Sequence, residues 1–284
     1  MHLKISHTTR YRYDEPVDHG LQRLRLIPRS GMSQTVRTWK VSPLGATVEA
    51  EYDDHYGNRV MLLNIDPDSS MLEIRVTGEI DTVDNTGVLG PHRGHLPLWV
   101  YRRDTALTAP GEGIGAMAEG FGDHDGNDLS LLHALSAKIG ESVEYRSGTT
   151  TVTTTAEGAL ENGSGVCQDQ THIFLAAARH LGYPVRYISG YLKMNDRVEQ
   201  DAGHAWAEAH VEGLGWVGFD ISNAISPDTG YVRVATGLDY DDAAPIRGMR
   251  RGAGLEKMSV ELRVAPGSSQ SQSQSGQGQQ QQSS

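Results

Sequence analysis

A chain of 284 residues with 37% hydrophobic content is long enough to form one large domain or two smaller ones around a true core. Its 36 acidic and 25 basic residues give a formal charge of −11, which argues against a nucleic-acid-binding protein. A single cysteine excludes an intramolecular disulfide framework, and no apolar stretch approaches the roughly 18 residues of a membrane span. Because the first residues also lack the apolar segment of a signal peptide, we expect a cytoplasmic protein without a nucleic-acid or membrane partner.

Residues 1–84 are predicted to form a β-rich N-terminal domain. Apolar and polar residues alternate along the first strand, so that one face carries Leu3, Ile5, His7, Thr9, Tyr11 and Tyr13. Further short strands are indicated by QRLRLIP, TVRTWKV, NRVMLLNI and MLEIRVTGEI, with turn residues between them. Such a succession favours an antiparallel β-sandwich or a small barrel.

Residues 85–266 mix helices and strands and are predicted to form a second, α+β domain. Apolar residues recur at helical spacing in NDLSLLHALSAKIGESV, which begins with an Asn or Asp cap. A second helix covers QDQTHIFLAAARHLG, where Gly182 marks the C-terminal end and Pro184 blocks continuation. Strands are predicted at YPVRYISGYL, HAWAEAHV and WVGFDI, so that one helix directs its N-terminus towards a sheet.

Two segments are predicted to lack regular structure. GEGIGAM, at residues 111–117, resembles a glycine-rich phosphate loop only loosely and follows no clear strand, so we interpret it as a flexible connector. Residues 267–284 consist only of Gln, Ser and Gly. Such a composition cannot bury enough surface to offset the entropy of ordering, which predicts a disordered tail.

The only cysteine, Cys167, lies at the predicted start of the second helix. The unpaired N–H groups and the dipole of a helix start favour an anion there. Gly163 and Gly165 precede it, and glycine allows the backbone either to approach a substrate closely or to adopt a positive φ. Asp169, in the same first turn, is expected to complement the dipole from the surface. The alternative is that the thiol is a small buried hydrophobic group.

A nucleophilic thiol also needs a base and a group that orients the base. A period of two along HAWAEAHV places His204, Trp206, Glu208 and His210 on one face and three alanines on the other, where they would pack closely against a bulky neighbour such as the helix. The next strand ends at Asp220, and the turn EGLG would return it towards His204, where a carboxylate could fix the imidazole tautomer. Taken alone, such a histidine is more often structural and such an aspartate a turn former.

Together these motifs resemble the transglutaminase-like superfamily, in its bacterial cysteine-protease-like branch. The resemblance rests on TTAEGALENGSGVCQD, LGYPVRYISGY, HAWAE, GWVGFD and YVRVATGLDYDDAAPIRG, and on TTRYRYDEPV, LRLIPR and DDHYGN nearer the N-terminus. It implies an α+β fold in which an antiparallel β-sandwich or barrel-like domain precedes a papain-like core. In that core, the helix that bears the cysteine packs on an antiparallel sheet. The resemblance covers nearly all of the chain except the tail.

The resemblance also implies a Cys-His-Asp triad, with Cys167 as nucleophile, His204 as base and Asp220 as the group that orients the base. The oxyanion would bind the Cys167 backbone N–H and one further donor. Tyr145 is our candidate for that donor, and an edge-strand tyrosine without such a role is the alternative. The family commonly has Asp-Pro-Thr where this chain reads Asp-Ile-Ser from Asp220, so we expect a looser loop after the carboxylate.

The competing interpretation of the same region is a zinc site formed by Cys167, His172, His204 and His210. The chain contains neither HExxH nor paired cysteines, so no recognised ligand spacing supports zinc. DDH at 53–55 and DYDD at 239–242 do not match an EF-hand and are interpreted as solvated turns. We therefore expect no metal and no other cofactor.

The sequence thus predicts a bacterial enzyme that hydrolyses amide bonds in a peptide or protein substrate through a thioester on Cys167. Attack on the amide releases an amine, to which His204 delivers a proton, and water then attacks the thioester. If an amine attacks instead, the enzyme is a protein-glutamine transamidase, because the triad chemistry is common to both. The alternative from another class is a module that binds peptides on this fold without turnover.

Overall fold

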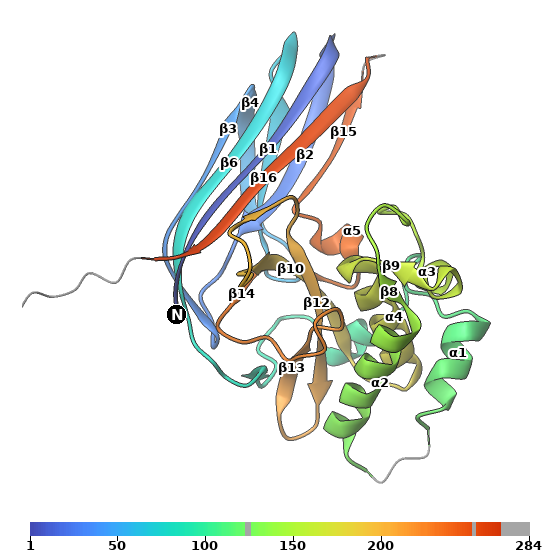
Figure 1. Cartoon of the computed structure of the whole chain (residues 1–284). Helices are drawn as coiled ribbons and strands as arrows, with labels where there is room; N and C mark the ends of the chain where they lie inside the picture. The colour runs from blue at the N-terminus through green and yellow to red at the C-terminus, as the bar shows by residue number, and fades with distance from the viewer. Residues whose placement is uncertain (123–125, 252–253, 268–284) are drawn as a thin grey trace, which may run out of the picture.

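The computed structural model describes residues 1–122, 126–251 and 254–267. A tall β-sandwich occupies one end of the molecule and a group of helices the other, with a third sheet between them (Figure 1). Apart from Gly267, the predicted tail at 267–284 lies outside the described residues. Within the described ranges, no helix has the length and apolar character needed to cross a membrane.

The sandwich consists of two antiparallel sheets with a shared apolar interior. In spatial order, the first sheet contains β11 (Glu199–Gln200), β16 (Glu256–Pro266), β1 (His2–Val17), β6 (Ser69–Thr82) and β3 (Gln34–Leu44). The second contains β15 (Ile246–Arg251), β2 (His19–Ile27), β5 (Arg59–Ile65) and β4 (Ala46–Asp53). The predicted alternation of the first strand is confirmed, because the side chains predicted to share one face are all buried: Leu3, Ile5, His7, Thr9, Tyr11 and Tyr13.

Two strands from the far end of the described chain complete this sandwich. β16 pairs with β1 from Leu3 opposite Pro266 to Tyr13 opposite Glu256, and β15 pairs with β2. The domain predicted at 85–266 includes both segments, whereas in the structure they pair with strands of the predicted N-terminal domain. Pairing between such distant segments depends on tertiary packing and leaves no local pattern from which a boundary could be predicted.

The helical half is built on the third sheet. The sheet contains, in order, β14 (Tyr231–Gly237), β10 (Val185–Leu192), β12 (His204–Val211), β13 (Gly215–Phe219) and β7 (Val88–Gly90). The helices are η1 (Leu98–Arg102), α1 (Glu112–Glu119), α2 (Asp128–Ser142), α3 (Ala156–Asn162), α4 (Cys167–His180) and α5 (Tyr240–Ala243). The two predicted helices correspond to α2 and α4, and the strands predicted at YPVRYISGYL, HAWAEAHV and WVGFDI correspond to β10, β12 and β13.

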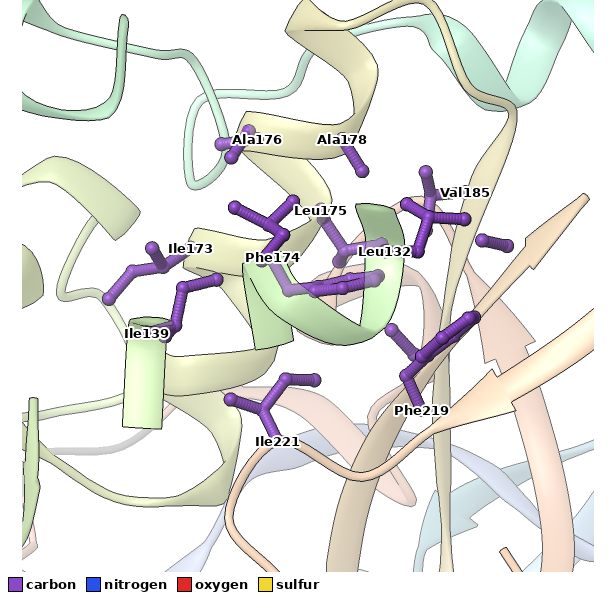
Figure 2. Packing of buried hydrophobic residues seen from close by; sticks show 14 of the residues in the cluster. Leu132, Ile139, Ile173, Phe174, Leu175, Ala176, Ala178, Val185, Phe219 and Ile221 are labelled. Atoms are coloured by element: carbon purple, nitrogen blue, oxygen red, sulfur yellow. The ribbon is translucent and has the colours of Figure 1, made fainter. Parts of the chain in front are cut away.

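Helix α4 is buried between the third sheet and the other helices. Figure 2 shows its apolar side chains among those of α2 and of the sheet. The ring of Phe174 stacks on that of Phe219 in β13, with centroids 5.3 Å apart. Ala205, Ala207 and Ala209 belong to the same buried cluster, which confirms that the alanine face of β12 packs against this helix. This packing fixes the helix, and therefore the position of its first residue, relative to the sheet.

The segment interpreted as a flexible connector, residues 111–117, instead begins helix α1. The carboxylate of Glu157, in α3, accepts hydrogen bonds from the backbone N–H groups of Gly111 (3.0 Å), Gly113 (2.6 Å) and Ile114 (3.1 Å). A Cβ at Gly111 would lie 2.5 Å from the Glu157 Cδ, so only glycine allows this approach. The glycines serve a helix N-terminus that is capped by a residue of another helix, and a local reading of the sequence cannot show this.

His7 is buried where the sandwich meets the third sheet. Its Nδ1 lies 3.0 Å from the Tyr191 hydroxyl, and its Nε2 lies 3.0 Å from the Thr9 hydroxyl. Burial lowers the pKa of His7 from 6.5 to about 4. The interface therefore contains a histidine that is neutral when the protein is folded and protonated in the unfolded chain at mildly acidic pH.

Acidification is accordingly expected to weaken the folded state through His7. Between pH 6.5 and about 4 the unfolded chain binds more protons than the native one, so the free energy of unfolding falls as the pH falls. We expect this residue to account for a loss of about 2–3 kcal/mol between pH 7 and 4.5. Urea unfolding at the two pH values measures the free energy of unfolding. Its decrease between pH 7 and 4.5 should be smaller in His7→Asn than in the wild type. The exposed-residue variant His180→Asn should lose as much as the wild type, and an equal loss in His7→Asn would contradict the assignment.

Candidate active site

Cys167 is the first residue of α4 and is half-buried. Of the two roles considered for the preceding glycines, Gly163 shows the positive φ, at +62°. Gly165 allows the close approach of a side chain of the protein, because a Cβ there would lie 2.7 Å from the Cβ of Asp169, and approach to a substrate stays a prediction. The thiol therefore lies at a helix start where the first-turn N–H groups have no acceptor within the helix.

Asp169 is buried, with 1% of its surface exposed, and the expectation of a surface position is wrong. Its Oδ2 accepts hydrogen bonds from the Val166 N–H (2.8 Å) and from the Thr150 hydroxyl (2.7 Å). It thus caps the helix from within, as a capping box does, and also holds the loop that contains Thr150. Both contacts fix the backbone on either side of Cys167.

A tight hairpin brings the predicted base and its partner together. In β12 and β13, Val211 lies opposite Gly215 and Ala207 opposite Phe219. Gly213 and Gly215 in the connecting turn have φ values of +80° and +82°. Asp220 follows β13 directly, and its Oδ2 lies 2.6 Å from the Nε2 of His204. The structure thus pairs the two residues that the sequence predicts to be paired.

Asp220 has no exposed surface, yet enough hydrogen-bond donors surround its carboxylate to stabilise a negative charge. Its Oδ2 accepts hydrogen bonds from the Tyr231 hydroxyl (2.6 Å) and the Asn223 side-chain amide (2.7 Å), and its Oδ1 from the Asn223 backbone N–H (3.2 Å). Burial raises the pKa of Asp220, but the hydrogen bond and charge of His204, then the donors Tyr231 and Asn223, outweigh burial and lower it. Sequence reasoning missed Tyr231, because it lies on β14 and meets Asp220 only in the folded protein.

His204 contacts both other members of the predicted triad. An ionised carboxylate only accepts hydrogen bonds, so the Nε2 of His204 donates to Asp220, and Nδ1 is the nitrogen left for the thiol of Cys167. Burial lowers the pKa of His204, but the hydrogen bonds to Asp220 and Cys167 outweigh it and hold the pKa above its usual 6.5. The arrangement favours an imidazolium beside the ionised carboxylate of Asp220.

The loop after Asp220 is pinned at several points, which differs from the looser loop expected without proline. Asp220 and Ile225 form a β-bridge, with hydrogen bonds of 2.9 and 3.2 Å. Ile221 is buried among the side chains beneath α4 (Figure 2), and the Ser222 hydroxyl donates to the Gln170 side chain at 2.7 Å. Side-chain packing and hydrogen bonds here restrain the loop that proline would restrain by its fixed φ.

Tyr145 lies on β8 (Glu144–Tyr145), which pairs in parallel with β9 (Ser164–Gly165) just before Cys167. Its side chain is 54% exposed and, together with His204, lines a cleft of about 690 Å³. Burial, and then the charges of Cys167 and Asp220, raise the pKa of Tyr145, so its phenol remains a proton donor at neutral pH. The structure places Tyr145 in the cleft beside the triad, and its role as an oxyanion donor stays a prediction.

The two further histidines of the competing zinc interpretation lie in other surroundings. The Nε2 of His172 accepts from the Tyr240 backbone N–H (3.1 Å), and burial lowers the pKa of His172 to about 3. His210 packs edge-on against Trp216, with ring centroids 5.4 Å apart. In the part of the chain that the structure describes, no three His, Cys, Asp or Glu side chains gather as a metal ion requires.

The two acidic segments interpreted as solvated turns make structural contacts. Asp54 accepts from the Nε of Arg25 (3.1 Å) and from the backbone N–H of Asn58 (2.9 Å). Asp239 is 5% exposed and caps α5 by accepting from the Asp242 N–H (3.2 Å). The segment at 239–242 is therefore partly buried, and hydrogen bonding within the protein accounts for its first carboxylate.

Two family models match successive parts of the chain. The bacterial transglutaminase-like N-terminal region matches residues 3–81, and the transglutaminase-like superfamily matches residues 115–221. The second match includes the positions of Cys167, His204 and Asp220.

Known proteins are similar to the chain over most of its length. An uncharacterized protein of Mycobacterium leprae is 27% identical over 281 residues, which cover 92% of this chain and 98% of the relative. An uncharacterized protein of Mycobacterium tuberculosis is 27% identical over 273 residues, covering 87% and 86%. The crystal structure of a candidate cysteine protease from Cytophaga hutchinsonii, 24% identical, covers 93% of this chain and 90% of its own with a TM-score of 0.75. That likeness shows a shared fold that includes both the sandwich and the core.

Proposed function

Because the chain belongs to the transglutaminase-like superfamily, we propose that it is a cysteine-dependent amide-bond hydrolase that acts on peptides or proteins through Cys167, His204 and Asp220. One observation carries the proposal. The buried Asp220 accepts from the Nε2 of His204 at 2.6 Å, which leaves Nδ1 to the thiol at the start of α4. This order of groups supports the assignment of a nucleophile, its base and the group that orients the base, and the base lines the cleft.

The reaction divides into two halves. The thiolate of Cys167 attacks the amide carbonyl carbon, a C–S bond forms, and the carbonyl electrons move onto oxygen. The Cys167 N–H, and Tyr145 as the second donor, stabilise this oxyanion. His204 gives its Nδ1 proton to the departing nitrogen, so that the C–N bond breaks and a thioester remains. Water then gives a proton to neutral His204 and attacks the thioester, which releases the acid and restores the thiolate and imidazolium.

Alkylation of the single thiol tests the Cys167–His204 pair directly. At pH 6 an unassisted thiol, whose pKa is about 8.5, is almost entirely protonated and reacts slowly with iodoacetamide. We expect the folded wild type to react about tenfold faster at pH 6 than His204→Ala, because the imidazolium stabilises the thiolate. The matched control is His210→Ala, which removes an imidazole from the other end of the same strand. Equal rates in the wild type and His204→Ala would refute the proposed interaction between Cys167 and His204, and with it the proposed mechanism.

The products then identify the reaction. Incubation with a pool of peptides, including peptides that contain glutamine, should give new peptide termini or free ammonia and an acyl adduct on Cys167 detectable by mass spectrometry. Adding a fluorescent primary amine distinguishes the two fates of the thioester. Incorporation of the amine in preference to hydrolysis would show a transamidase, and stable binding of peptides without product would favour a binding module.

A further inference from the structure

We infer that Tyr231 and Asn223 are positioning residues that hold the Asp220 carboxylate ionised and in the orientation that His204 requires. The inference rests on the proposed function and concerns two residues that the predicted triad does not include. Both residues line the cleft with His204, but the hydroxyl of Tyr231 and the side-chain amide of Asn223 are directed at Asp220, through which they act. Tyr231 comes from β14, whereas Asn223 comes from the loop after Asp220, so two separate segments converge on one carboxylate.

The arrangement of donors around Asp220 carries the inference. Three side chains donate to the same oxygen, Oδ2: His204 at 2.6 Å, Tyr231 at 2.6 Å and Asn223 at 2.7 Å. Hydrogen bonds to a carboxylate are stronger than those to a neutral carboxyl group, so three donors on one oxygen favour the ionised form. The Asn223 backbone N–H binds the other oxygen at 3.2 Å, which fixes the rotation of the carboxylate.

The position of Tyr231 is itself restrained by packing. Its ring meets that of Trp206 edge-on, with centroids 5.4 Å apart, and only 5% of its surface is exposed. Burial, followed by the charge of Asp220, raises the pKa of Tyr231, so its hydroxyl remains a donor throughout the working range. Trp206 extends from the same face of β12 as His204, and the two rings stack with centroids 6.2 Å apart. Strand β12, which carries His204, therefore also positions the Tyr231 hydroxyl against the Asp220 carboxylate through Trp206.

The other groups around the imidazole are few and identifiable. His204 faces Cys167 from α4, Asp220 from the end of β13, and Tyr231 from β14. Tyr145 from β8 lines the same cleft, and the charge of Arg197 opposes part of the rise in the pKa of Tyr145 that burial, Cys167 and Asp220 cause. Among these groups, Tyr231 donates to the charge that stabilises the imidazolium. Removing its hydroxyl leaves a buried carboxylate with one donor fewer, so a proton binds to it more readily.

Tyr231→Phe tests the inference, because it removes one hydroxyl and keeps the ring against Trp206. The His204 Nε2 proton, held against a buried carboxylate, should give a separate downfield NMR resonance that disappears when Asp220 is protonated. In Tyr231→Phe this loss should occur about half to one pH unit higher than in the wild type. The same variant should lower kcat about tenfold with little change in KM, because the hydroxyl that is removed binds Asp220 and the ring still lines the cleft.

Two further variants separate positioning from general damage. Asn223→Ala changes an exposed residue and should shift the resonance and kcat in the same direction as Tyr231→Phe. The inference can therefore still be tested if Tyr231→Phe does not fold. The matched control is Tyr183→Phe, which removes an equivalent hydroxyl that donates to Asp128 at 2.7 Å, beyond the end of α4 opposite to Cys167, and should change neither readout. Circular dichroism at each pH separates loss of the resonance from acid unfolding.

The outcomes distinguish this inference from the proposed function. If Cys167→Ala abolishes turnover but Tyr231→Phe and Asn223→Ala match the wild type in resonance and kcat, the inference is overturned and the function stands. If no amide is hydrolysed but the resonance in Tyr231→Phe is lost at higher pH, the positioning role stands and the function fails.

Discussion

Cys167→Ala is expected to lower amide hydrolysis by at least about 10⁴-fold, because no other group in the chain can form the thioester. The protein should nevertheless fold. The side chain is half-buried, its polar partner is His204, and alanine suits the first turn of a helix. Initial rates on the substrate found by peptide screening measure the loss, with thermal unfolding followed in parallel.

Cys167→Ser sharpens that experiment. The hydroxyl is close in size to the thiol and fits among the same neighbouring side chains, but it is a far weaker nucleophile at neutral pH. Both variants should therefore be inactive while their melting temperatures stay close to that of the wild type. A folded Cys167→Ala protein that still hydrolyses its substrate would contradict the assignment, and one that keeps its peptide affinity and biological effect would favour the binding module.

Asp220→Asn is expected to reduce kcat by about 10³–10⁴-fold and also to destabilise the protein by about 3 kcal/mol near pH 6. The amide keeps the size of the side chain but removes the charge that stabilises the buried imidazolium of His204. It also removes the fixed acceptor that selects the productive tautomer. The kinetic loss and the stability loss thus have the same origin, and urea unfolding measured with the kinetics tests both.

The pH dependence of the stability loss identifies the ion pair. The pKa of Asp220 is lowered from 3.8 and that of His204 is raised from 6.5, so the pair contributes fully between these two values. Its contribution is lost as the pH falls through the lowered pKa of Asp220 or rises through the raised pKa of His204. Asp220→Asn should therefore cost most near pH 6 and least at strongly alkaline pH. The exposed control Asp196→Asn, in the same cleft, should cost little at any pH, and a pH-independent loss in Asp220→Asn would refute the ion pair.

The features that sequence predicts best are those that depend on neighbours along the chain. The alternation of the first strand, the helix that begins at Cys167, and the hairpin that returns Asp220 to His204 all follow from residue periodicity and short turns. The contacts of Tyr231 and of Glu157 could not be predicted in this way, because each is made with a residue of another element. The burial of Asp169 was missed for the same reason, since it depends on the loop that contains Thr150.

The pairing of β1 with β16 sets the order in which the sandwich can form during synthesis. β1 lies between β6 and β16, and its partner Glu256–Pro266 follows nearly the whole catalytic core in the chain. Until that segment leaves the ribosome, one edge of β1 has no partner and can pair with other exposed strands. A nascent chain that stalls after Asp220 but before residue 256 would carry this open edge. Such a chain is expected to aggregate even though it already contains all three residues of the predicted triad. The protein's dependence on chaperones should accordingly be greatest during synthesis.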